Sequence, residues 1–96
     1  MNIAAVMAQA KKMQAKRDKE IKVLHETKFK IEKQGVTVVL MGNRRIESID
    51  MHEALVDPED KETLQDLTII AINEAQELID IEEKKIEASA SPSMPF

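Results

Sequence analysis

The chain has 96 residues, no cysteine, and two phenylalanines as its only aromatic residues. This length gives one domain with an aliphatic core, and a chain so short buries only about 60–65% of its surface alone, which favours a dimer. The lack of cysteine excludes a disulfide framework and thiolate chemistry, and it fits a reducing cytoplasm. We expect neither a secretion signal nor a membrane partner, because no apolar run approaches about 20 residues.

The net charge of −4 conceals an uneven distribution of charged residues. Residues 1–25 carry six basic and two acidic side chains, whereas residues 53–96 carry three basic and twelve acidic ones. A basic segment in an acidic chain argues against indiscriminate binding of polyanions, but it permits a local anionic partner.

Residues 1–25 predict a first helix that Asn2 caps. Apolar residues recur there at alternating steps of three and four, namely Ile3, Val6, Ala10 and Met13. Three lysines, Lys12, Lys16 and Lys19, stand at i, i+4 and i+7, so they line one edge of this helix. On charge pattern alone, a solvated helix face explains these lysines as well as an anion-binding face does.

Two strands are predicted next. Residues 27–33 alternate, with Thr27, Phe29 and Ile31 on one face, as in a half-buried strand. A turn at Gln34-Gly35 follows, and residues 36–41 are rich in β-branched side chains, which is typical of a central strand.

A hairpin turn at Gly42-Asn43 leads into a third predicted strand, residues 44–51. Strict alternation would place Ile49 and Met51 on one face with Arg45 and Glu47, and Ile46 on the other. A bulge at Glu47-Ser48 would break that alternation instead.

Residues 57–86 predict a long helix that begins with Asp57 as N-cap and Pro58 in its first turn. We expect its sheet-facing side to contain Leu64, Leu67, Ala71, Ala75 and Leu78. Isoleucines at positions 69, 70 and 72 leave almost no polar face there. Such a helix is either a core helix with one broad apolar turn or a helix whose second side a partner subunit covers.

Together these elements predict an α+β fold of the α-β-β-β-α type, with a three-stranded antiparallel sheet and two long helices. We expect one domain over residues 1–88 and a loose tail over residues 89–96, which contain Ser and Pro. Both edges of such a small sheet are open to pairing with a second copy, which again favours a homodimer.

The residues give no indication of catalysis. The chain has no cysteine, and structural or solvent roles account for its two histidines. With only two glycines it has no glycine-rich phosphate loop. No metal-ligand spacing is found either. We therefore expect no enzyme, no cofactor and no small-molecule substrate.

The run PEDKETLQDLTIIAINEAQELI resembles the second-helix signature of the YbaB/EbfC family of bacterial nucleoid-associated proteins. The basic first segment MAQAKKMQAKRDKEI, the strand and turn GVTVVLMGN, and the final Met-Pro-Phe are also similar to that family. The resemblance covers nearly the whole chain.

This resemblance implies a homodimer joined through its sheets, with helices that project as arms, located in the nucleoid of the bacterial cytoplasm. It implies non-enzymatic binding of double-stranded DNA, with effects on nucleoid organisation and gene expression. The DNA contacts that it implies fall on the basic part of the first helix: Lys11, Lys12, Lys16, Arg17, Lys19 and Lys22. Because lysine predominates, we expect binding through the phosphate backbone with low sequence specificity. The alternative is a protein–protein assembly factor that uses the broad apolar face of the long helix and binds no DNA.

Overall fold

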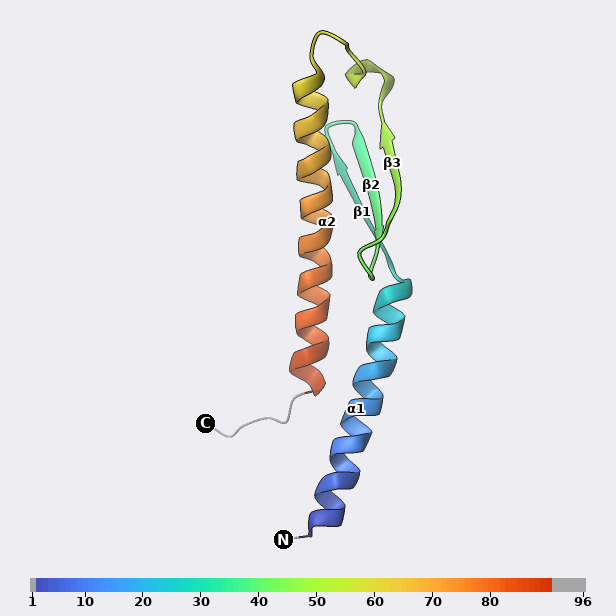
Figure 1. Ribbon diagram of the computed structural model, residues 1–96, viewed down its shortest axis with the longest axis vertical. Coiled ribbons are helices and arrows are strands. Elements are labelled where there is room, and N and C mark those ends of the chain that lie inside the picture. The colour runs from blue at the N-terminus through green and yellow to red at the C-terminus, as the bar shows by residue number, and fades with distance from the viewer. Residues whose placement is uncertain (1, 91–96) are drawn as a thin grey trace.

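The computed structural model describes residues 2–90 (Figure 1). Its elements follow the predicted order, with one short 3-10 helix, η1, inserted before the last helix. Their bounds are α1 Ile3–Glu26, β1 Lys28–Lys33, β2 Val36–Met41, β3 Ile46–Met51, η1 Glu53–Leu55 and α2 Lys61–Ala90. The predicted α+β class and the α-β-β-β-α order are confirmed.

At both ends of α1, backbone groups that lack a partner within the helix form hydrogen bonds with neighbouring residues. Asn2 is the N-cap, as predicted, and its side chain accepts a hydrogen bond from the backbone N–H of Ala5 at 3.3 Å. At the other end, the N–H of Thr27 donates to the carbonyl of Leu24 at 3.0 Å, and its hydroxyl donates to the carbonyl of Val23 at 2.7 Å. Thr27 thereby ends the helix and starts the extended chain of β1.

The sheet is an antiparallel meander in which β2 lies between β1 and β3. Gln34 and Gly35 form the first turn with φ of 47° and 99°, and positive φ at both positions is what a type I′ hairpin turn of two residues requires. In the second turn the residue with positive φ is Arg44, at 74°, rather than Gly42. Gly42 is needed for another reason: a Cβ there would overlap the carbonyl of Leu24 at the end of α1.

The third strand contains a bulge, which was one of the two patterns that the sequence allowed for it. Val38 pairs with Ile49 and Val39 with Ser48, but Leu40 pairs with Ile46, so Glu47 is the extra residue. Strict alternation is therefore wrong for this strand. The bulge moves Ile46 to the same face as Ile49 and Met51.

The long helix begins later than predicted, at Lys61. Asp60, not Asp57, caps it: its carboxylate accepts from the backbone N–H of Thr63 at 3.3 Å and from the Thr63 hydroxyl at 2.8 Å. The Asp57 carboxylate instead accepts from the backbone N–H of Glu59 at 2.9 Å, which holds a turn that includes Pro58.

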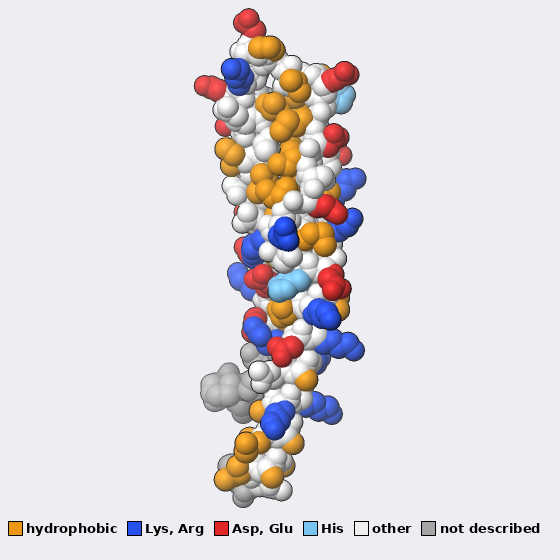
Figure 2. All heavy atoms as spheres, turned by 45° about the vertical axis from the view of Figure 1, so that its right-hand side comes forward, with side chains coloured by type: hydrophobic (Ala, Val, Ile, Leu, Met, Phe, Trp, Pro, Cys, Tyr) orange, Lys and Arg blue, Asp and Glu red, His pale blue; other side chains and the backbone are white. Residues whose placement is uncertain are grey.

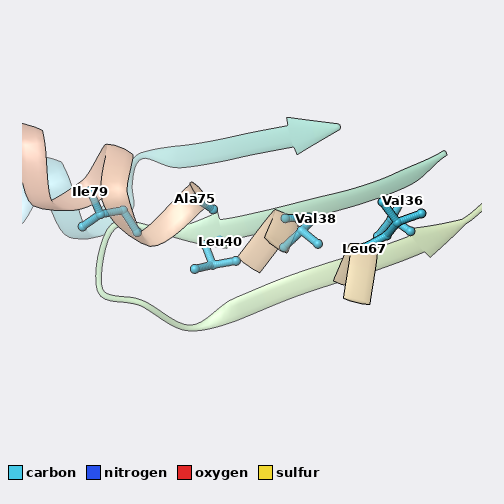
Figure 3. Packing of buried hydrophobic residues seen from close by; sticks show 7 residues of the cluster. Val36, Val38, Leu40, Leu67, Ala75 and Ile79 are labelled. Atoms are coloured by element: carbon cyan, nitrogen blue, oxygen red, sulfur yellow. The ribbon is translucent and has the colours of Figure 1, made fainter. Parts of the chain in front are cut away.

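The core lies between α2 and one face of the sheet (Figure 3). Val36, Val38 and Leu40 of β2 are fully buried against α2, as predicted. On the helix, Leu67, Ala71 and Ala75 are buried as predicted, and Leu64 is half-buried. Leu78 was wrongly assigned to this face: it is 38% exposed, and Ile79 takes its place in the core. Residues 78 and 79 follow Ala75 at steps of three and four, so helical spacing allows either of them to face the core. Which one does so depends on how α2 lies against the sheet, and spacing does not show that.

The molecule is long and thin, with extents of 70 × 28 × 13 Å. The sheet covers the first part of α2, and α1 runs antiparallel to the last part and then continues beyond its end (Figure 1). The helix that extends beyond the rest of the molecule is therefore α1 rather than the longer α2. The predicted tail boundary at residue 89 falls inside α2, and residues 91–96 lie outside the described residues.

Candidate nucleic-acid interface

Five of the six basic residues predicted to contact DNA share one side of α1. At about 100° per residue, they fall within an arc of about 140°. All five are exposed: Lys11, Lys12, Lys16, Lys19 and Lys22, which we call the lysine face. They extend over about 17 Å of the helix axis, which is about half a turn of duplex DNA.

The opposite side of α1 packs against α2. Leu24 is buried on this side of α1, and Glu20 and Ile21 are half-buried. The hydroxyl of Ser89, near the end of α2, lies 3.4 Å from the carboxylate of Glu20. The lysine face is exposed to solvent, but one of its edges lies near α2, where Lys16 and Lys19 line a hollow together with Glu82 and Ile86.

Arg17, the sixth predicted residue, lies on the α2 side of α1 and forms an ion pair with Glu87. Its Nε and Nη2 atoms donate to one carboxylate oxygen at 2.9 and 2.5 Å. This hydrogen bond and the attraction between the two charges raise the pKa of Arg17, and the same hydrogen bond lowers the pKa of Glu87. Arg17 therefore connects the two helices, whereas the five lysines project into solvent.

Few acidic groups lie close enough to neutralise the charges of the lysine face. Lys16 lies 3.9 Å from Glu20, one helical turn away, and this is a long, exposed pair. Across residues 2–90, no acidic group comes within 4.0 Å of the amino groups of Lys11, Lys12, Lys19 or Lys22.

Several acidic groups of α2 are paired with basic groups. Arg44, at the end of the β2–β3 turn, reaches both Asp80 and Glu83, and these partners raise its pKa. On the β1 side, Lys33 lies 2.7 Å from Glu74. These pairs neutralise part of the negative charge of α2, and α1 extends past the end of α2. For both reasons, α2 repels an anion on the lysine face less strongly than its acidic composition indicates.

A second surface was missed by sequence reasoning. Beside α2, the β3 part of the core-facing side of the sheet lies open, and Ile46, Ile49 and Met51 are 50%, 39% and 38% exposed. A hollow lined by Met51, Leu64, Gln65, Thr68 and Ile69 continues this surface onto α2. We call Ile46, Ile49, Met51, Leu64 and Ile69 the apolar strip. The bulge considered for the third strand could have predicted this strip from the sequence, because only the bulged register puts Ile46 on this side of the sheet.

Figure 2 shows these surfaces from the β3 side of the molecule. Hydrophobic side chains gather in a column over the sheet and α2, basic side chains project lower down, and hydrophobic ones gather again at the lower end of α1. Within the described part of the chain, no three acidic or histidine side chains come together as metal ligands, and no helix is long and apolar enough to cross a membrane.

These features define an elongated α+β protein in which a basic helical arm extends beyond a three-stranded sheet. The chain belongs to the YbaB/EbfC DNA-binding family, whose family model matches residues 1–94. The resemblance noted in the sequence is thus confirmed.

The similar proteins agree with this assignment. A nucleoid-associated protein of Mycoplasmopsis pulmonis is 50% identical over 97 residues, covering 100% of this chain and 97% of its own length. A nucleoid-associated protein of Streptococcus agalactiae is 42% identical over 98 residues, covering 100% and 99%. The fold resembles the crystal structure of an uncharacterized protein from Helicobacter pylori, with a TM-score of 0.72 at 18% identity over 91% of this chain and 94% of that one.

Proposed function

We propose that this protein binds double-stranded DNA through the lysine face of α1, without catalysing a reaction. The observation that carries the proposal is the exposed arc of Lys11, Lys12, Lys16, Lys19 and Lys22, in a chain whose net charge is −4. Membership of a DNA-binding family identifies the anion as DNA. The names of its relatives support a place in the bacterial nucleoid. We propose that the protein helps to organise the nucleoid there and influences gene expression.

The mechanism is neutralisation of phosphates by lysine, with release of the counterions that surround DNA. Counterion release supplies most of the free energy of this kind of binding. Lysine acts as a point charge on a flexible stem, unlike arginine, whose planar group can read a guanine edge with two hydrogen bonds. Binding through such contacts depends weakly on base sequence, because phosphates carry no sequence information.

Arg17 has a different part in this proposal. Its two hydrogen bonds to Glu87 hold the middle of α1 against α2, and so they set the direction in which the arm leaves the body of the molecule. We therefore assign the phosphate contacts to the five lysines and treat Arg17 as the residue that positions them.

The DNA-binding unit that we propose is a homodimer joined through the apolar strip. Ile46 and Ile69 are 50% and 57% exposed, and the three strip residues of β3 each pair with a buried residue of β2. Continuous apolar surface that borders a core is typical of protein interfaces. A second copy that covers the strip also brings a second lysine face to the same DNA.

The proposal is tested by measuring the affinity for a random duplex at several salt concentrations. If about five or six phosphates are contacted, log K should fall against log salt with a slope near −5. The triple variant Lys12→Glu, Lys16→Glu, Lys19→Glu should bind all duplexes more weakly and to a similar extent.

The matched control reverses the same number of charges on the sheet and turn, as Lys28→Glu, Lys30→Glu, Arg45→Glu. These residues are exposed and lie off the lysine face, so this variant should keep most of its affinity. If the control loses binding and the α1 variant does not, the sheet is the DNA surface. If neither variant changes binding, or if the wild-type protein does not bind at low salt, the protein-assembly alternative replaces this proposal.

A further inference from the structure

The outer end of α1 differs from the lysine face that follows it. Residues 2–10 contain no ionisable side chain, so they add nothing to phosphate binding. Ile3, Val6 and Met7 are 69%, 56% and 57% exposed there. Ile and Val are weaker helix formers than Ala or Lys, so placing them on a solvated helix gives no local advantage. Their presence points to a contact that residues 2–90 of the single chain do not provide.

The apolar residues of this outer end continue the face of α1 that packs against α2. Ile3, Val6, Ala10 and Met13 are separated by three, four and three residues, and at about 100° per residue they lie in line with Arg17 and Leu24. Glu87 and Ser89 meet α1 at Arg17 and Glu20, and α2 ends at Ala90. The packing face therefore extends past the end of its helical partner by about three turns (Figure 1).

We propose that this outer segment, Ile3 to Met13, packs antiparallel against the same segment of another copy of the protein. The three–four spacing is the one with which two helices form a shared seam. A face without charge can meet its own copy without repulsion. A parallel arrangement would place Lys11 and Lys12 of both copies side by side, whereas an antiparallel one sends them to opposite ends of the seam.

The antiparallel arrangement decides which copies are joined. If Ile3 of one segment faces Met13 of the other, the midpoint of the seam along the helix axis is level with residue 8, whose side chain points away from the seam. The two sheets then lie at opposite ends of the pair. Two copies held in this way cannot also meet through their apolar strips, which lie beyond α1 at the far end of each molecule (Figure 1). The pairing therefore links different dimers, and because each dimer has two arms, it can continue from dimer to dimer.

The lysine face is free to act during this pairing, because it occupies the other side of α1. Linked dimers would then hold separate stretches of duplex together. This consequence rests on the proposed function, whereas the pairing of the segments does not.

The pairing is tested with two variants that add the same charge to opposite sides of the arm. Val6→Glu places a carboxylate in the seam, and Ala8→Glu places one about 160° away on the helix. Sedimentation equilibrium from low to high micromolar concentration should show association beyond the dimer for the wild-type protein and for Ala8→Glu. It should show at least a tenfold weaker association for Val6→Glu. Equal association of the two variants, or a wild-type protein that stays at the dimer, overturns the inference.

Cross-linking tests the direction of the seam, since the chain has no cysteine of its own. In the antiparallel pair, residue 3 of one copy faces residue 13 of the other, whereas the two copies of residue 3 lie about 15 Å apart along the seam. The double variant Ile3→Cys, Met13→Cys should therefore be joined between copies by a short bifunctional thiol reagent, and each single variant should not. Efficient cross-linking of the single variants contradicts the antiparallel arrangement, and cross-linking of none contradicts the pairing.

The same samples separate this inference from the proposed function. The triple lysine variant should lose DNA binding but still associate. If the wild-type protein binds DNA without associating beyond the dimer, only the inference fails. If it associates without binding DNA at low salt, only the proposed function fails.

Discussion

Two neighbouring residues of α2 test the packing at the smallest scale. Ile79 is fully buried in the core, whereas Leu78 is 38% exposed. Ile79→Ala should lower the free energy of unfolding by about 2–5 kcal/mol, because it removes buried methyl groups and leaves a cavity. Leu78→Ala should lower it by less than about 1 kcal/mol. Denaturant unfolding of the two variants measures both values, and a larger loss for Leu78→Ala would mean that α2 is rotated relative to the sheet.

The Arg17–Glu87 pair gives a prediction on pH at the same scale. Its hydrogen bond lowers the pKa of Glu87, so the pair stabilises the fold above the ordinary pKa of a glutamate. That contribution is lost as the pH falls through the lowered pKa, and it is small because the pair is exposed to solvent. In an NMR titration, Arg17→Ala should raise the midpoint of the Glu87 carboxyl. Lys16→Ala removes the neighbouring charge but no hydrogen bond to Glu87, so it should leave that midpoint nearly unchanged.

At the scale of elements, Gly42 is where the β2–β3 turn meets the end of α1. Its N–H donates to the carbonyl of Thr27 at 2.8 Å, and a Cβ at this position would overlap the carbonyl of Leu24. Gly42→Ala should therefore force the end of α1 away from the turn and cost roughly 1–3 kcal/mol of stability. Ser48→Ala, on an exposed position of β3, is the control and should change stability by about 0.5 kcal/mol at most. Thermal unfolding of both variants checks this, and a fully stable Gly42→Ala variant would show that α1 and the turn are not in close contact.

At the scale of the whole molecule, the apolar strip predicts a dimer that one charge can dissociate. Ile49 lies in the strip, and its neighbour Ser48 lies on the other face of β3. In a two-fold dimer each substitution occurs twice, so Ile49→Glu buries two carboxylates and should weaken dimerisation by at least a factor of ten. Ser48→Glu should dimerise like the wild-type protein. Sedimentation equilibrium distinguishes the two, and a wild-type protein that is monomeric at micromolar concentration would exclude the strip as a dimer interface.

Local sequence determined most of the elements of this protein. The cap at Asn2, the alternation of residues 27–33 and the β-branched run of residues 36–41 depend on neighbours within a few positions, so the start of α1 and the first two strands were predicted closely. The start of α2 was not, because Asp57 and Asp60 are both suitable caps, and the turn that Asp57 forms with Glu59 decided between them. The family was also recognisable from the sequence, since the segments that carry the resemblance follow one another along the chain in the same order as in the family.

Tertiary structure decided the surfaces. Helical spacing alone places Arg17 outside the arc of the five lysines, but only the packing of α1 against α2 shows that Arg17 pairs with Glu87 while the lysines stay exposed. Likewise, the pattern of β3 allowed two registers, and the pairing with β2 selected the bulge that brings Ile46 into the apolar strip. Hydrophobic periodicity indicates which side of a helix or strand is apolar. It does not indicate what that side contacts, because the contact depends on residues far away in the chain.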